Sequence, residues 1–225
     1  RVVCPDVPGR GRSDWLAVKE DYNYSTYCAN MAALVAWLHT DQVDWIGTSM
    51  GGIIGMLLAA QSNTPIRRLI INDIGPLVPK AALERIGRYV GTDPRFADRV
   101  EAEHYLREVH AGFGPLSDAQ WAHLAQYSVR RHANDHYRLT YDPGIARPFH
   151  EKPLEDVDLW AMWDSIRCPV LVIRGAESDL LLSETADEMQ RRGPPMDLVE
   201  LAGVGHAPAL MSDDQIRIVR DWLLS

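Results

Sequence analysis

The chain has 225 residues, a net charge of −8, 46% hydrophobic residues and 24% charged residues. This composition is ordinary for a soluble globular protein, and the length predicts one domain or one domain with an insertion. The negative charge argues against a broad nucleic-acid surface, because phosphate binding needs clustered Lys and Arg. No run of apolar residues is long enough for a transmembrane helix, so no membrane span is expected.

The cysteines indicate a reducing compartment. Cys4, Cys28 and Cys168 are odd in number and far apart, which fits neither a disulfide framework nor a zinc site. The chain also opens without the basic and apolar regions of a signal peptide. These features predict a cytoplasmic protein.

The first 75 residues alternate between short apolar runs and helical patterns. The order is a strand at 2–4, a helix over 27–38 with Ser25 or Thr26 as a candidate N-cap, a strand at 43–46, a buried helix over 50–60 and a strand at 69–71. Short apolar strands that alternate with helices favour a parallel sheet with both faces covered.

Residues 76–158 interrupt this alternation, because they contain helical patterns but no convincing strand. Helices are predicted over 81–90 and 96–109, and a third begins after Ser117, a good N-cap. We interpret this region as an inserted helical lid.

The alternation then resumes toward the C-terminus. It gives a strand at 170–173, a helix over 184–190, a strand at 198–201 and a last helix with Ile216, Val219 and Leu223 on its inner face. The expected fold is therefore α/β, with a mostly parallel sheet, helices on both faces and a helical lid inserted before the last two strands. The core takes residues 1–75 and 159–225, and the lid takes 76–158.

A candidate nucleophile lies between a predicted strand and a predicted helix. The run Gly47-Thr48-Ser49-Met50-Gly51 matches G-x-S-x-G in the strand–turn–helix context that this motif requires. A serine at such a tight turn has a strained backbone, and a Cβ two residues to either side is expected to collide with neighbouring chain. Ser49 is therefore the candidate nucleophile, and the Met50 N–H is a candidate oxyanion donor. Gly52 and Gly55 are expected to let the helix pack closely on the sheet.

A candidate general base follows the last predicted strand. A serine hydroxyl needs a base to accept its proton, and a third group must hold that base. The chain has eight histidines, but His206 differs from the others by its position in Gly203-Val204-Gly205-His206-Ala207-Pro208. Catalytic groups in parallel sheets gather at the carboxyl ends of the strands, so His206 is the predicted base.

The choice of acid leaves alternatives open. Asp179 lies in the loop after the 170–173 strand, where its carboxylate could accept the Nδ1–H of His206 and fix the tautomer. Glu177 lies nearby but closer to the strand, and Asp73 ends the earlier 69–71 strand. We predict Asp179 as the acid, with Asp73 as the second candidate.

The serine turn at 47–51, the Asp179 loop and the His206 loop follow one another along the chain in the order found in the α/β-hydrolase superfamily. The chain therefore resembles a member of that superfamily with a helical lid. The run Asp6-Val7-Pro8-Gly9-Arg10-Gly11-Arg12-Ser13 also resembles a loop of that superfamily. The likeness spans essentially the whole chain and is specific to the superfamily rather than to a substrate. The nearest groups are small carboxylesterases, enol-lactonases and carbon–carbon bond hydrolases.

The chain departs from that pattern at its beginning. Such proteins usually carry an upstream strand that ends in His-Gly and supplies a second oxyanion N–H. That segment is absent here, so we expect the sequence to be part of a longer protein. Losing one oxyanion donor typically costs about 10²- to 10³-fold in turnover. The activity of the fragment alone stays open.

The resemblance implies hydrolysis of a carboxylic ester or lactone through an acyl-enzyme, with no metal and no organic cofactor. Carbon–carbon bond hydrolysis or a perhydrolase reaction on the same three residues is the alternative, and a non-catalytic ligand receptor is a less favoured one. Haloalkane dehalogenase and epoxide hydrolase chemistry is disfavoured, because those relatives need Asp where this chain has Ser49. The expected partner is a small-molecule carbonyl substrate rather than nucleic acid or membrane, and a homo-oligomer stays open.

Overall fold

The computed structural model describes residues 1–132, 135–151 and 153–225. Its main sheet has the strand order β1-β2-β7-β8, and every neighbouring pair is parallel. The strands are β1 (Val43–Thr48), β2 (Ile66–Asn72), β7 (Val170–Gly175) and β8 (Met196–Leu201). The parallel sheet and its four strands from residue 43 onward are confirmed.

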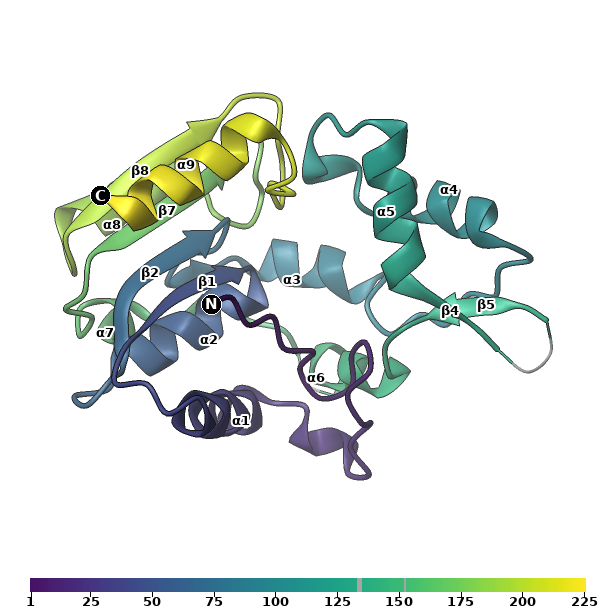
Figure 1. The fold of residues 1–225 in the computed structure, drawn as a ribbon, viewed down its shortest axis with the longest axis horizontal. Coiled ribbons are helices and arrows are strands. Elements are labelled where there is room, and N and C mark those ends of the chain that lie inside the picture. Colours follow the sequence, from purple (N-terminus) through teal and green to yellow (C-terminus); the bar gives the residue numbers. More distant parts are fainter. Residues whose placement is uncertain (133–134, 152) are drawn as a thin grey trace. The chain divides into compact units, whose positions relative to one another are not determined.

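Helices cover both faces of this sheet, as predicted. The helices next to these strands in the chain are α2 (Met50–Ala59) after β1, α7 (Trp160–Trp163) before β7, α8 (Ser183–Arg191) after β7 and α9 (Asp213–Leu224) after β8. Ile70, Leu171 and Ile173 point to one face, where they pack with apolar side chains of α9, which lies along β7 and β8 (Figure 1). The alternate residues Leu69 and Ile71 point to the opposite face, against the glycines of α2. This two-sided burial explains why β2 and β7 contain runs of consecutive apolar residues.

The inner face of α9 differs in part from the prediction. Ile216 is 48% exposed and points outward, whereas Val219 and Leu223 pack against the sheet together with Ile218 and Trp222. The buried stripe of this helix therefore begins at Ile218 rather than at Ile216, and one of the three expected positions lies outside it.

The N-terminal segment contains a second difference. Residues 2–4 form no strand, and Val2 is 88% exposed. An apolar run becomes a strand only when a neighbour pairs with its backbone, and no described strand pairs with this segment. The first long helix, α1, runs over Tyr24–Trp37. It begins after Asn23, whose Oδ1 accepts the Thr26 N–H at 3.0 Å, so Asn23 replaces the expected caps.

Between residues 76 and 158 the helices are α3 (Lys80–Gly87), α4 (Arg99–Val109), α5 (Asp118–Ser128) and the short α6 (Arg147–His150). Ser117 caps α5 through a reciprocal capping box with Gln120, which confirms that helix start. The expectation of no strand is wrong, because two small antiparallel pairs occur: β3 (Leu77–Val78) with β6 (Val157–Asp158), and β4 (Val129–Arg131) with β5 (Tyr137–Leu139). Strands of two or three residues are too short to show a period of two in the sequence.

The chain divides into two compact units. The first holds residues 1–30, 83–111 and 116–154, and the second holds 31–82, 112–115 and 155–225. The first unit contains the cluster of Phe96, Leu106 and Trp121, whereas the second contains the main sheet. The expected lid boundaries at 76 and 158 stay a prediction. Within the described ranges, no helix combines the length and apolar character that crossing a bilayer requires.

Candidate active site

Ser49 occupies the turn between β1 and α2, and its backbone is in the left-handed region at φ 50° and ψ −116°. A non-glycine residue in such a conformation stores about 1–3 kcal/mol of strain, which persists only when the surroundings enforce it. A Cβ at Gly47 would overlap the carbonyl of Gly51, so that glycine is required by close backbone approach. A Cβ at Gly51 would meet nothing within 4 Å, and the expected collision on that side is wrong.

Hydrogen bonds hold the elbow in place. The Ser49 N–H donates to the Asn72 carbonyl at 3.0 Å, and the Ser49 carbonyl accepts from Gly52 and Ile53 at 2.8 and 3.1 Å. Met50 is the first residue of α2, so the positive end of the helix dipole lies next to Ser49. The Met50 N–H as oxyanion donor stays a prediction.

The close packing expected of the other two α2 glycines is confirmed. A Cβ at Gly52 would lie 2.5 Å from Ile74 Cγ2, and a Cβ at Gly55 would lie 2.7 Å from Trp45 Cδ1. Both distances are below van der Waals contact, so neither position can take a larger residue without movement.

His206 lies within hydrogen-bonding distance of Ser49, as the sequence requires. Its Nε2 is 3.0 Å from Ser49 Oγ, and its side chain is 10% exposed. The loop that carries it, after β8, is held by two backbone hydrogen bonds, Glu177 N–H to Val204 O at 2.9 Å and Gly205 N–H to Gly112 O at 2.8 Å. All of these residues belong to the second unit.

The carboxylate beside His206 is that of Asp73, not Asp179. Asp73 Oδ2 lies 2.8 Å from His206 Nδ1, and the Asp73 side chain is fully buried. Asp179 is exposed in the loop after β7, where its neighbour Ser178 takes the buried position. Both aspartates follow strands that end at the same edge of the sheet. The Asp73 side chain turns inward to His206, whereas Asp179 is exposed, and the sequence does not show this difference.

Three donors surround the buried Asp73 carboxylate. Its Oδ1 accepts the Gly175 N–H at 2.8 Å, and its Oδ2 accepts the Ser178 hydroxyl at 2.6 Å in addition to the His206 contact. Burying a carboxylate is costly unless hydrogen bonds replace its hydration, and this set provides that replacement. These hydrogen bonds hold the Asp73 carboxylate in place beside the imidazole.

Ser178 was missed as a functional candidate. Its Oγ donates to Asp73 and accepts the N–H groups of Leu180 and Leu181 at 3.2 and 3.1 Å. The same atom thus holds both the loop after β7 and the Asp73 carboxylate. A serine next to an aspartate in a loop has no distinguishing pattern, so the sequence carried no usable signal for it.

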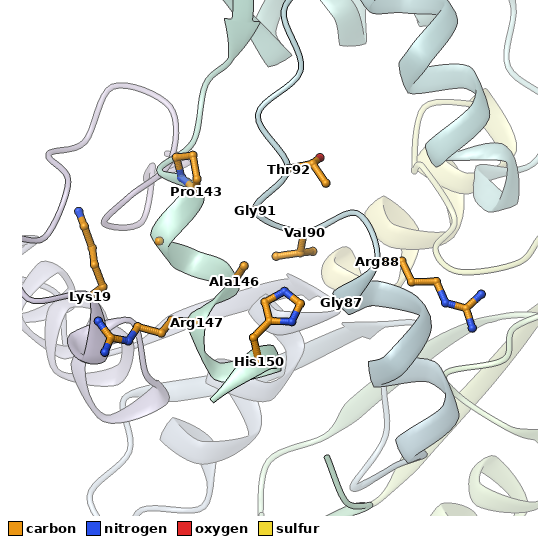
Figure 2. Close-up of a pocket in the computed structure, with 11 residues that line it drawn as sticks. Lys19, Gly87, Arg88, Val90, Gly91, Thr92, Pro143, Ala146, Arg147 and His150 are labelled. Atoms are coloured by element: carbon orange, nitrogen blue, oxygen red, sulfur yellow. The ribbon is translucent and has the colours of Figure 1, made fainter. Parts of the chain in front are cut away.

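A cavity of about 520 Å³ lies in the first unit, among residues that include Lys19, Val90, Arg147 and His150, and it contains none of Ser49, Asp73 and His206. Figure 2 shows the His150 ring near its centre, whereas Lys19 and Arg88 extend to opposite sides. Arg147 pairs with Glu20 and Glu151, and Lys19 pairs with Asp142. The cationic groups of the cavity do not converge on one point, so we do not assign a catalytic role to the cavity.

No set of His, Cys, Asp and Glu side chains in the described part of the chain is arranged to hold a metal ion. The groups that the site brings together are a hydroxyl, an imidazole and a carboxylate in series.

Comparison with known proteins identifies the family of this chain. The model of the alpha/beta hydrolase family matches residues 1–219. The 3-hydroxybutyrate-oligomer hydrolase of Cupriavidus necator is 44% identical over 226 residues, which cover 97% of this chain and 77% of that protein. Esterase Rv0045c of Mycobacterium tuberculosis is 24% identical over 84% of this chain and 62% of its own length.

A solved structure agrees with these matches. The crystal structure of an alpha/beta hydrolase from Novosphingobium aromaticivorans has a TM-score of 0.88 and 35% identity, covering 98% of this chain and 79% of that one. Because the family model matches nearly every residue and the parallel sheet carries a serine elbow, the chain belongs to the α/β-hydrolase family.

Proposed function

We propose that this protein is a serine hydrolase that cleaves a carboxylic ester or lactone through an acyl-enzyme. Ser49 would be the nucleophile, His206 the general base and Asp73 the acid that orients it. The observation that carries the proposal is the unbroken hydrogen-bond chain of 3.0 Å from Ser49 Oγ to His206 Nε2 and 2.8 Å from His206 Nδ1 to Asp73 Oδ2. Both distances lie within the range that proton transfer needs.

In the proposed cycle, His206 takes the Ser49 proton as Oγ attacks the carbonyl carbon. The negative charge that develops on the carbonyl oxygen would be stabilised by the Met50 N–H at the start of α2. His206 then returns the proton to the leaving alcohol, and the acyl group stays on Ser49. A water deprotonated by His206 hydrolyses this ester and restores the hydroxyl.

For the substrate, we propose oligoesters of a short hydroxy acid. The support is the 44% identity to the 3-hydroxybutyrate-oligomer hydrolase over nearly the whole chain. The proposed partner is accordingly a small molecule, and the proposed location is the cytoplasm. Carbon–carbon hydrolysis on the same three residues remains the alternative, and a ring-cleavage diketone assayed beside the esters would reveal it.

The test of the proposed function is the variant Ser49→Ala, assayed with p-nitrophenyl butyrate and with a 3-hydroxybutyrate dimer. Turnover should fall by about 10⁴-fold or more, because no other group replaces the nucleophile. Ser183→Ala, which changes an exposed hydroxyl, serves as the matched control and should keep full turnover. A fluorophosphonate should add mass at Ser49 in the unmodified protein. Full activity in Ser49→Ala would refute the proposal, whereas esterase activity without dimer cleavage would refute only the substrate.

A further inference from the structure

Asn72 is a fully buried polar residue at the end of β2, where the neighbouring strand positions are apolar. Its amide Nδ2 donates to Thr48 Oγ1 at 3.0 Å and to the Pro208 carbonyl at 2.8 Å. The Pro208 carbonyl can only accept, so it fixes which end of the Asn72 amide faces it. Oδ1 then points to a buried place where no described atom donates to it.

These contacts join the two segments that carry the reacting groups. Thr48 immediately precedes Ser49, and Pro208 lies two residues after His206. The Asn72 backbone carbonyl also accepts the Ser49 N–H at 3.0 Å. One side chain and its own backbone thus connect the nucleophile turn to the histidine loop, and the next residue in the chain is Asp73.

The unsatisfied oxygen argues that stability alone does not explain this residue. A buried acceptor without a donor costs about 1–3 kcal/mol, which an apolar side chain would avoid. Buried polar groups that remain incompletely satisfied call for an explanation, and functional sites are where such costs are retained.

We propose that Asn72 is a positioning residue that sets the separation between Ser49 Oγ and His206 Nε2. It does so by cross-linking the end of β1 to the loop after β8. This inference rests on the proposed function, because it assigns Asn72 a role in the reaction of Ser49 and His206. A misplacement of about 1 Å between reacting groups can cost about 10²-fold in rate, so a loose cross-link is enough to matter.

The proposal predicts an effect on chemistry rather than on binding. Asn72 is fully buried, so it has no surface with which to contact a substrate. In Asn72→Ala, kcat and the rate of Ser49 labelling by a fluorophosphonate should fall about 10- to 100-fold, with little change in KM. Thr48→Val removes only one of the two acceptors and should give a smaller loss in the same direction. Asn30→Ala, which changes an exposed amide on α1, should leave both rates unchanged.

The experiment measures labelling and turnover across pH on the whole protein, at a temperature well below the thermal unfolding midpoint of each variant. Asn72→Asp, which keeps the shape but loses the amide donor, provides a second reading if the alanine variant folds poorly. A lowered midpoint with an unchanged labelling rate would mean that Asn72 is only structural and would overturn the inference. If the unmodified protein shows neither labelling at Ser49 nor Ser49-dependent turnover, the proposed function itself fails.

Discussion

Two carboxylates at the same edge of the sheet, Asp73 and Asp179, satisfy the same sequence rule, and burial separates them. Asp73 is enclosed and accepts three hydrogen bonds, whereas Asp179 is exposed. A carboxylate in a low-dielectric environment interacts more strongly with an imidazolium than one in water does. The buried residue is therefore the better candidate partner for an imidazolium at His206.

This difference gives a prediction for the acid. Asp73→Asn should lower kcat by about 10⁴-fold, because the amide can stabilise neither the required tautomer nor the imidazolium. Asp179→Asn should stay near the activity of the unmodified protein. Steady-state rates with p-nitrophenyl butyrate would measure both. The reverse ranking would return the acid role to Asp179 and contradict the hydrogen bonding described for Asp73.

Ser49 and His206 could be named from the sequence as candidate nucleophile and candidate base because each has a local pattern. Ser49 sits in a glycine motif between two recognisable elements, and His206 follows the last strand. Asp73 has a pattern too, an aspartate at the end of a strand, but it shares that pattern with Asp179, and Ser178 and Asn72 have no pattern at all. Their contacts depend on which side chains turn inward where three distant segments meet, and that is a property of packing rather than of spacing.

Glycine determines how closely α2 packs on the sheet. A Cβ at Gly55 would lie 2.7 Å from Trp45 Cδ1 and 2.8 Å from Leu69 Cδ1, whereas a Cβ at Gly51 would meet nothing within 4 Å. Both are glycines of the same helix, so helix propensity does not distinguish the two positions, whereas contact with the sheet does.

Gly55→Ala should therefore destabilise the protein by about 1–3 kcal/mol, the usual cost of overpacking a core. Gly51→Ala should instead raise the unfolding free energy by about 0.5–1 kcal/mol, because alanine is the better helix former. Urea unfolding monitored by circular dichroism would measure both. Equal destabilisation by the two variants would show that the α2 contact is not the cause.

Prediction of elements succeeded for the four strands of the main sheet, whose short apolar runs alternate with helices; β2 and β7 are mostly buried, whereas β1 and β8 also contain exposed residues. It failed for residues 2–4, where Val2 and Val3 are apolar but exposed, because pairing is a tertiary property. It also failed for β3 to β6, which contain only two or three residues each. Local pattern therefore located the sheet that supports the site but not the irregular parts of residues 76–158.

Each of the two compact units contains a buried carboxylate. The second holds Asp73, and the first holds Asp142, which is 3% exposed. Asp142 Oδ2 accepts the Tyr22 hydroxyl at 2.6 Å and pairs with Lys19, and Oδ1 accepts the Gly144 N–H at 2.9 Å. This network joins residues 19–22 to residues 142–144 inside the first unit.

The network makes the first unit sensitive to acid and to alkali. Burial alone would raise the pKa of Asp142, but the hydrogen bonds from Lys19, Tyr22 and Gly144 outweigh it, and the pKa lies below its usual value. A lowered pKa contributes stability above about pH 4, the value in the unfolded chain, and this contribution is lost as pH falls through the folded pKa. Burial, then the bond to Asp142, raises the pKa of Tyr22 to about 12. That contribution is present below about pH 10 and is lost as pH rises toward the folded value.

Asp142→Asn should therefore reduce the unfolding free energy at pH 7, and this deficit should shrink as pH falls from 7 through the folded pKa of Asp142, because the protonated carboxyl no longer makes its contribution. Urea unfolding over this pH range would measure the difference, with the exposed Asp187→Asn as control. Amide exchange at pH 7 should accelerate most in residues 1–30, 83–111 and 116–154, because cooperative units open separately when their own contacts are weakened. A deficit independent of pH would rule out Asp142 ionisation as the cause. Equal acceleration in the segments that carry Ser49, Asp73 and His206 would mean that the two units unfold as one.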